Sequence, residues 1–297
     1  MKIDVIMPVK GDSEYIIESI LSILDNLDLY DNLTIVLDRA SDSTQSIVQE
    51  FLKYDSRIRC LVSIDPGISN ALNFGISRSN AELIARMDSD DVVNQNRFNT
   101  QRRFLYRNQD YILVGSDINF IDKDGNRIKS KIYPKSDKSI RKSLIFFNSF
   151  AHPSVMIRRN ALINCGLYRD NFDGQEDYEL WSRLSNFGRV KNLRRKLINY
   201  RIHPGQVTRS LKLNQVTQNE IKRLNAFNYL IKLHKKNPKK ASKKTNKLTR
   251  ISSDLDSELY IKGKILVLVK GFLRYPKTIY TVIFYFTLNI ITSKFLK

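Results

Sequence analysis

The stretch LIARMDSDDVVN, residues 83–94, decides the fold because it joins an apolar strand pattern directly to three carboxylates. Asp88, Asp90 and Asp91 lie within four positions, although the whole chain carries a formal net charge of +20. Carboxylates this close repel one another unless a cation or a proton relieves them. The stretch therefore predicts a strand that ends in a cation site.

Three similar runs precede this stretch. Apolar and β-branched residues dominate 3–9, 33–38 and 58–63, and together with 83–87 they recur at intervals of about 25 residues, which leaves room for helices. Alternating strands and helices predict a parallel sheet with right-handed crossovers. Ligands of such sheets bind beyond the carboxyl ends of the strands.

Helical patterns fill the intervals between the runs. Apolar residues recur on a 3.6-residue stripe between Glu14 and Leu27, and again around 47–52, where Ser41 or Asp42 would cap the helix. A third helix is predicted over 68–79, after a Pro-Gly pair.

Polar residues gather where the predicted strands end, at 10–14, 38–42 and 88–91. No GxGxxG or GxxxxGK[ST] loop is present, so a nucleotide would need another way to hold its phosphates. Mg²⁺ or Mn²⁺ provides one, because these ions bind one or two protein carboxylates together with phosphate oxygens.

A second interpretation of the acidic stretch is a helix start. Asp91 would cap a helix over 92–106, and Asp88 and Asp90 would lie at the favourable end of its dipole. One aspartate is enough for a cap, so the surplus favours a metal, and Asp91 stays divided between ligand and cap.

Composition limits the class of protein. With 297 residues, 42% of them hydrophobic and 27% charged, the chain has the length for one α/β core and an appendage. Cys60 and Cys165 are isolated, so neither a disulfide framework nor a zinc site is indicated, and a reducing cytosolic compartment fits.

The basic excess is concentrated in the tail. Residues 234–297 hold 15 Lys and Arg against 3 Asp and Glu, a net of +12, which leaves +8 of the total of +20 for the rest. Such a segment predicts a phosphate partner in lipid or in nucleic acid. Nucleic acid is disfavoured because the basic run 234–250 is nearly free of aromatic residues and the acidic rim would repel a phosphodiester.

The end of the tail is strongly apolar. Its longest uncharged run, 278–293, would measure about 24 Å as a helix, against about 30 Å for a bilayer's hydrocarbon core. An in-plane membrane anchor with basic residues at anionic headgroups therefore fits better than a span. A core helix packed on the rest of the protein is the alternative.

Six motifs occur in an order that resembles the inverting family 2 glycosyltransferases with the GT-A fold, a family of bacterial transferases that build surface polysaccharides. They include GISNALNFGISRSNAELIARMDSDD, GQEDYELWSRL and YRIHPGQVT. The six motifs span residues 5–24, 35–44, 67–91, 152–159, 174–184 and 200–208.

The resemblance implies an α/β GT-A fold, with a Rossmann-like, mostly parallel central sheet flanked by helices. The catalytic domain would cover 1–210, with a nucleotide-sugar half at 1–95 and an acceptor half at 96–210. A helical, basic connector at 211–259 and amphipathic membrane-associating helices at 260–297 would complete the chain.

The resemblance also implies roles on the nucleotide side. Pro8 and Val9 would line the base pocket, Glu14 its edge, and Asp38 would accept from uracil. Asn73 would lie near the phosphates, although Leu72 stands where the family often has a basic residue. The loop after Asp38 also lacks the family's usual glycines.

For the metal, a manganese or magnesium ion that would bridge the two phosphates, the resemblance implies Asp90 as the first ligand. Asp88 would face the ribose or diphosphate and be the second ligand. Asp91 is the third candidate, and His203 would complete the coordination or bind phosphate, with a surface-loop histidine as its alternative.

On the acceptor side, the resemblance implies that Asp177 is the catalytic base and that Glu176 assists it. Without the resemblance, both acids are typical of ordinary charges at a helix N-terminus. The other candidates for acceptor or diphosphate contacts are Trp181, Arg201, Arg209 and His152, among which Trp181 and His152 also fit structural roles.

The resemblance implies transfer of galactose or glucose from its UDP donor to GlcNAc-diphospho-undecaprenol, with a β-1,3 linkage in O-antigen synthesis. Another donor or acceptor, such as a GalNAc lipid, is the alternative. A basic binding protein without catalysis is a remote one. The expected location is the cytoplasmic face of the bacterial inner membrane, at an anionic lipid surface, with no nucleic-acid partner.

Overall fold

The computed structural model describes residues 1–204, 221–222 and 225. The chain divides into two compact units, Met1–Lys222 and Arg223–Lys297, and nearly all of the described residues belong to the first. Arg209, the expected membrane helices at 260–297 and the expected connector at 211–259, apart from 221–222 and 225, lie outside the described residues.

The first half of the described fold is the predicted parallel sheet. Its strands are β1 (Ile3–Gly11), β2 (Asn32–Ala40), β3 (Ile58–Val62) and β4 (Leu83–Arg86), in the order β3-β2-β1-β4, with every neighbouring pair parallel. All four predicted strands are therefore confirmed.

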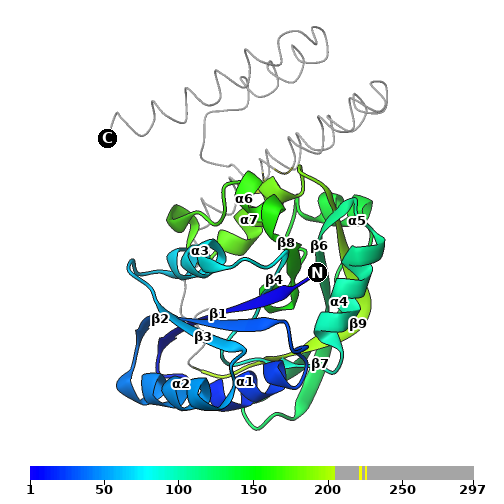
Figure 1. The fold of residues 1–297 in the computed structure, drawn as a ribbon. Helices are drawn as coiled ribbons and strands as arrows, with labels where there is room; N and C mark the ends of the chain where they lie inside the picture. The colour runs from blue at the N-terminus through cyan, green and yellow to red at the C-terminus, as the bar shows by residue number, and fades with distance from the viewer. Residues whose placement is uncertain (205–220, 223–224, 226–297) are drawn as a thin grey trace, which may run out of the picture. The chain divides into compact units, whose positions relative to one another are not determined.

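Helices cover both faces of this parallel half (Figure 1). They are α1 (Ile16–Leu24), α2 (Asp42–Tyr54) and α3 (Ile68–Arg78). Side chains alternate across a strand, so Val5 and Met7 pack with α1 in one core while Ile6 packs with α3 in the other. The hydroxyl of Ser41 accepts from the Thr44 amide at 3.3 Å, which confirms it as the cap of α2.

The second half adds strands in both directions. Its elements are β5 (Val92–Val93), α4 (Arg97–Arg107), β6 (Tyr111–Ile121), β7 (Arg127–Lys131), α5 (Asp137–Ser143), β8 (Met156–Arg158), α6 (Arg159–Asn164), α7 (Glu176–Leu184) and β9 (Arg189–Arg201), with short 3₁₀ turns at His152–Ser154 and Asp170–Phe172.

Within the described part of the chain, the sheet has nine strands and curls around its core (Figure 1). After β4 the order continues β8-β6-β9-β5, and β7 pairs with β6 at the side. β8 is antiparallel to both β4 and β6, while β6 and β9 run parallel. The sheet is therefore mostly parallel, as expected: β6 and β9 have the direction of β1–β4, and the short strands β5, β7 and β8 run the other way.

The capping interpretation of Asp91 is wrong. Val92 and Val93 form β5, which pairs with β9, so no helix begins there. The next helix, α4, begins at Arg97, and its N-cap Asn96 adopts φ 60°. The two consecutive β-branched valines favour an extended backbone, which separates Asp91 from the helix.

Among the described residues, no helix is long and apolar enough to cross a membrane.

Candidate active site

Three aspartates of the turn between β4 and β5, Asp88, Asp90 and Asp91, form the acidic cluster of the site. Each offers an oxygen, and these oxygens lie within 4.8 Å of one another. Asp91 is fully buried, and its Oδ1 accepts from the Arg201 amide at 2.9 Å. Its Oδ2 is buried without a hydrogen-bond partner among the described residues.

The electrostatics of the cluster fit a cation. Burial raises the pKa of Asp91 well above its usual range, and the charges of Asp88 and Asp90 raise it further. A buried carboxylate oxygen without a donor is costly, and a hard divalent ion that binds carboxylate oxygens removes that cost. The residues therefore fit the expected Mn²⁺ or Mg²⁺, with Asp88, Asp90 and Asp91 as candidate ligands.

His203 lies beside this cluster, as predicted. Its Nε2 is 3.0 Å from Asp90 Oδ2, and its ring centroid is 5.2 Å from that of Tyr15. The contact joins residues 113 positions apart. His203 therefore contacts the cluster at Asp90, and its role as a metal ligand stays a prediction.

Arg201 hydrogen-bonds to the backbone of the acidic cluster, and its side chain is not exposed for contact with a phosphate. Its side chain is 1% exposed, and its Nε donates to the Asp90 carbonyl at 3.0 Å. Its guanidinium also pairs with Glu18 of α1 and lies 4.3 Å from the centre of the Tyr15 ring. The predicted diphosphate contact by Arg201 is therefore corrected to a structural one.

Two of the predicted nucleotide residues also have structural roles. Val9 is 1% exposed within the core under α1, which leaves its side chain no free surface for a base. Asn73 uses both ends of its amide on the backbone of Tyr168, donating at 2.9 Å and accepting at 3.0 Å. Asn73 therefore fixes that loop rather than meeting phosphates.

The remaining nucleotide candidates lie near the ends of β1 and β2. Pro8 is partly exposed near the end of β1, and Glu14 is exposed in the loop after it. Asp38 is 4% exposed, with Oδ2 accepting from the Gly67 amide at 3.0 Å and Oδ1 paired with Arg39 at 3.1 Å. Gly67 adopts φ 111°, a conformation that L side chains rarely adopt.

The second pair of acids begins α7. Glu176 and Asp177 are its first two residues. Glu176 is 6% exposed, and burial followed by the charge of Asp177 raises its pKa to about 8. Burial also raises the pKa of Asp177, while Asn148, which donates to its Oδ2 at 2.6 Å, opposes this.

Arg86 connects the two acidic groups. It is 5% exposed at the end of β4 and forms an ion pair with Asp88. Burial lowers its pKa, but the charge and hydrogen bond of Asp88, together with the charges of Tyr168 and Asp91, outweigh burial and raise it. Its charge in turn lowers the pKa of Glu176 and Asp177, and the charge of Asp177 raises the pKa of Asp88. The acidic cluster and the Glu176–Asp177 pair are therefore electrostatic neighbours.

The model of glycosyl transferase family 2 matches residues 4–172, more than half of the chain. The chain belongs to glycosyl transferase family 2. An Escherichia coli O-antigen biosynthesis glycosyltransferase, WbnJ, is 35% identical over 68% of this chain and 80% of its own. The E. coli UDP-Gal:alpha-D-GlcNAc-diphosphoundecaprenol beta-1,3-galactosyltransferase is 27% identical over 65% of this chain and 70% of its own.

A solved structure shares the fold. The S. aureus TarS fragment 1–349 in complex with UDP-GlcNAc superposes with a TM-score of 0.63 at 17% identity, covering 76% of this chain. This chain matches 66% of that fragment's length. The likeness confirms the GT-A architecture expected for a family 2 glycosyltransferase.

In this family 2 chain, Trp181 belongs to the core. It is 1% exposed, and its ring centroid lies 5.7 Å from those of Phe150 and His152. No face of the indole is open for an acceptor sugar, so the expected acceptor contact of Trp181 is corrected to a structural role.

His152 contacts both Glu176, at the start of α7, and Tyr168, in the loop before α7. Its Nε2 is 2.9 Å from the Tyr168 hydroxyl, and its Nδ1 is 3.6 Å from Glu176 Oε1. Burial, followed by the charge of Arg86, holds its pKa well below the usual range, so His152 is neutral. The contacts place it behind Glu176 rather than on an acceptor surface.

Two functional residues escaped sequence reasoning. Arg86 interrupts an otherwise apolar strand, and a charge in such a run is a signal that sequence alone offers. Asn148 gave no such signal, because only the fold brings it to Asp177, 29 residues away.

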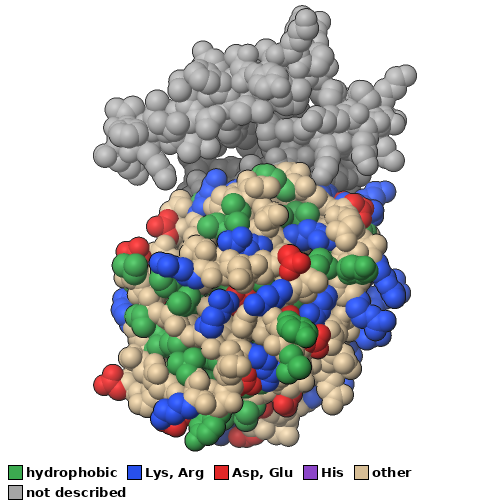
Figure 2. All heavy atoms as spheres, in the orientation of Figure 1, with side chains coloured by type: hydrophobic (Ala, Val, Ile, Leu, Met, Phe, Trp, Pro, Cys, Tyr) green, Lys and Arg blue, Asp and Glu red, His purple; other side chains and the backbone are tan. Residues whose placement is uncertain are grey.

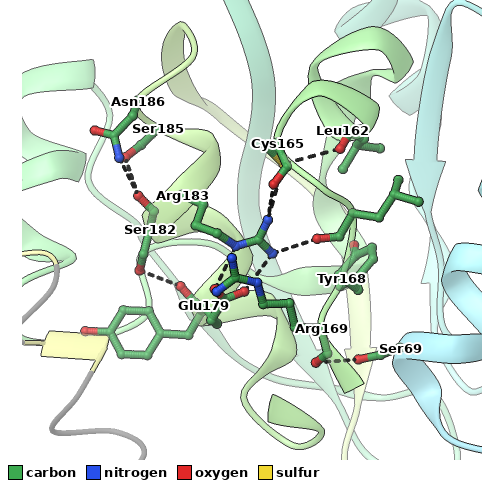
Figure 3. A network of polar contacts seen from close by, with 12 residues as sticks. Ser69, Leu162, Cys165, Tyr168, Arg169, Glu179, Ser182, Arg183, Ser185 and Asn186 are labelled. Carbon is green, nitrogen blue, oxygen red and sulfur yellow. Dashed lines mark hydrogen bonds and ion pairs between the residues drawn. The ribbon is translucent and has the colours of Figure 1, made fainter. Parts of the chain in front are cut away.

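An ion-pair network joins α7 to the loop before it (Figure 3). Glu179 is 1% exposed and pairs with Arg183 at 2.7 Å and Arg169 at 3.2 Å. Arg183 donates to the carbonyls of Cys165 and Leu167, which fixes the loop that carries Tyr168.

We expect Glu179→Ala to lower the free energy of unfolding by about 3–5 kcal/mol, because it strands two guanidinium groups, one of them buried. Urea denaturation measures it. Glu50→Ala is the control, since Glu50 forms an exposed pair with Lys53 that contributes at most about 1 kcal/mol. Equal losses in the two variants would contradict the role of the network.

Proposed function

We propose that the chain transfers galactose or glucose, with inversion, from UDP to GlcNAc-diphospho-undecaprenol, forming a β-1,3 linkage in O-antigen synthesis. The names of the two E. coli relatives support the acceptor and the process. The TarS complexes with UDP-GlcNAc and UDP support a uridine diphosphate donor.

The observation that carries the proposal is the proximity of the two acidic groups. A transferase of this kind needs one carboxylate to take the proton of the acceptor's hydroxyl. It needs other carboxylates to hold a cation at the donor's diphosphate. Asp177 and the acidic cluster meet this need, because the charge of Asp177 raises the pKa of Asp88 and the charge of Arg86 lowers the pKa of both.

Each group has a defined task in the proposed reaction. When bound at Asp88, Asp90, Asp91 and His203, Mn²⁺ or Mg²⁺ supplies positive charge for the departing diphosphate. The Asp177 carboxylate removes the proton from the attacking sugar hydroxyl, and Asn148 holds that carboxylate in place. The hydroxyl attacks the anomeric carbon from the face opposite the diphosphate, which inverts the configuration.

A donor-by-acceptor screen tests the proposal. The full chain is incubated with UDP-galactose, UDP-glucose, UDP-GlcNAc or UDP-GalNAc, each with GlcNAc or GalNAc diphosphate lipids, and the product linkage is read by NMR. We expect a β-1,3-linked hexose on the GlcNAc lipid. Transfer with another donor, or to the GalNAc lipid alone, would replace the proposed substrates but keep the family activity.

The proposed location is the cytoplasmic face of the inner membrane, where such a lipid acceptor would be met. The basic and apolar tail supports it through composition, with +12 of net charge in residues 234–297.

The raised pKa of Glu176, about 8 against 4.5, predicts a pH-dependent stability. The Glu176 carboxyl binds its proton more tightly in the folded state than in the unfolded chain. This protonation stabilises the fold fully below pH 4.5, and the stabilisation is lost as the pH rises through 8. We expect wild type to lose up to about 5 kcal/mol relative to Glu176→Gln across this window. Urea denaturation from pH 5 to 9 measures it, and parallel curves would contradict the raised pKa.

A further inference from the structure

A turn beside the candidate base exposes two aromatic rings. Phe146 and Phe147, just after α5, are 40% and 52% exposed, whereas Leu144 and Ile145 before them are buried. Large adjacent apolar side chains at the surface are typical of a binding site. The rings are therefore candidates for an apolar ligand.

The turn is held rigidly against α7. The amides of Phe146 and Phe147 both donate to the Ser143 carbonyl, at 2.9 and 3.0 Å. The Tyr178 hydroxyl donates to the Leu144 carbonyl at 2.5 Å, and the next residue, Asn148, donates to Asp177. The backbone that carries the two aromatic rings is thus fixed next to the residue that would take the proton of the acceptor's hydroxyl.

The charge of Lys131, at the end of β7, interacts with the charge of the same carboxylate. Lys131 is exposed at the end of that strand, with its ammonium 4.9 Å from the centre of the Tyr133 ring. Partial burial of the ammonium lowers the pKa of Lys131, and the nearby charge of Asp177 opposes this. Among the described residues, no carboxylate forms an ion pair with Lys131, so its charge is available to an anion.

The surface around Lys131 is also positively charged. Lys138 and Lys142 of α5 are exposed, whereas the one acid of the segment 127–147, Asp137, is paired with Arg141 at 2.8 Å. Lys and Arg also outnumber Asp and Glu on the face of the molecule in Figure 2. An anionic ligand is complementary to this segment.

We propose that Phe146, Phe147 and Lys131 form a docking subsite for the isoprenoid diphosphate of the acceptor. The phenyl rings contact the hydrocarbon, and the ammonium contacts the diphosphate. The proposal rests on the transfer to a lipid diphosphate proposed above, and it replaces the acceptor contacts expected of Trp181 and Arg201.

The test compares three acceptors: GlcNAc diphosphate esters of undecanol and of ethanol, and ethyl α-GlcNAc, which lacks the diphosphate. The double variant Phe146→Ser/Phe147→Ser is expected to raise KM about tenfold for the undecyl ester, leaving kcat and the ethyl ester unchanged. Lys131→Gln is expected to raise KM similarly for both diphosphate esters but not for the ethyl glycoside. An unchanged ratio of KM between the acceptors would overturn the proposal.

Matched controls come from α2. Tyr54 is 83% exposed, and Lys53 beside it is exposed too, so Tyr54→Ser and Lys53→Gln remove an aromatic ring and a charge away from Asp177. Both should keep the wild-type KM for every acceptor. A rise in their KM equal to that of the test variants would assign the effect to general surface changes and overturn the subsite.

A binding measurement separates this proposal from the proposed function. Sugar-free undecyl diphosphate is titrated calorimetrically into each variant. If no acceptor is glycosylated, the proposed substrates fail, and weaker binding by the test variants still supports the subsite. If transfer occurs and all variants bind the probe equally, the function stands and the subsite is overturned.

Vesicles of phosphatidylglycerol without acceptor distinguish a lipid surface from the acceptor itself. Test variants that lose vesicle binding, yet keep the wild-type KM for the soluble undecyl ester, would make these residues a general membrane contact and overturn the subsite. Retained vesicle binding with a raised KM supports it.

Discussion

Asp177→Asn is expected to lower kcat by about 10²–10⁴-fold, because it removes the carboxylate that accepts the proton of the attacking hydroxyl. The affinity for UDP should change much less than kcat, since Asp177 contacts Asn148 and the start of α7 and acts on the acidic cluster only through its charge. Steady-state kinetics and calorimetric titration with UDP measure the two quantities.

Asp170→Asn is the matched control, because Asp170 is exposed in the same region and contacts the Asn171 amide. It should keep the wild-type kcat. A decrease in kcat of less than about tenfold in Asp177→Asn would move the base to Glu176, the other carboxylate at the start of α7.

Asp90→Ala is expected to abolish Mn²⁺-dependent transfer, by at least about 10²-fold, while the fold stays intact. The side chain lies between the other two aspartates and His203, so its loss removes a central candidate ligand. Calorimetric titration with Mn²⁺ in the presence of UDP should show weakened binding, and circular dichroism should match wild type.

Asp25→Ala is the control, because it removes an exposed aspartate from the end of α1. It should leave the transfer activity and the affinity for Mn²⁺ unchanged. Chelation gives the second arm of the test. Full transfer activity in EDTA would contradict the metal assignment, whatever the variant does.

Periodicity predicted the parallel half of the fold because local patterns determine it. Each strand from β1 to β4 is an apolar run, and each helix between them has one apolar stripe. The second half was predicted only as part of a family fold. Its antiparallel strand β8 is three residues long, and its pairing with β4 and β6 depends on partners distant in sequence.

The candidate site could also be predicted from sequence only in part. The acidic cluster could be located from sequence because its members are adjacent along the chain. The burial of the individual candidates could not be predicted from sequence. An arginine is expected at the surface, and only the folded structure shows that it is enclosed. Arg201 is 1% exposed only because Tyr15, Glu18 and the Asp122 turn meet around it.

The contacts of Arg201 also have a consequence for folding during synthesis. Its amide binds Asp91 and its side chain binds the Asp90 carbonyl, across 110 and 111 positions. Contacts of such separation form late, after the intervening loop has closed. The aspartates therefore acquire their final arrangement only when β9 joins the sheet, so a nascent chain that lacks β9 captures metal poorly, and metal affinity reports the completion of the fold.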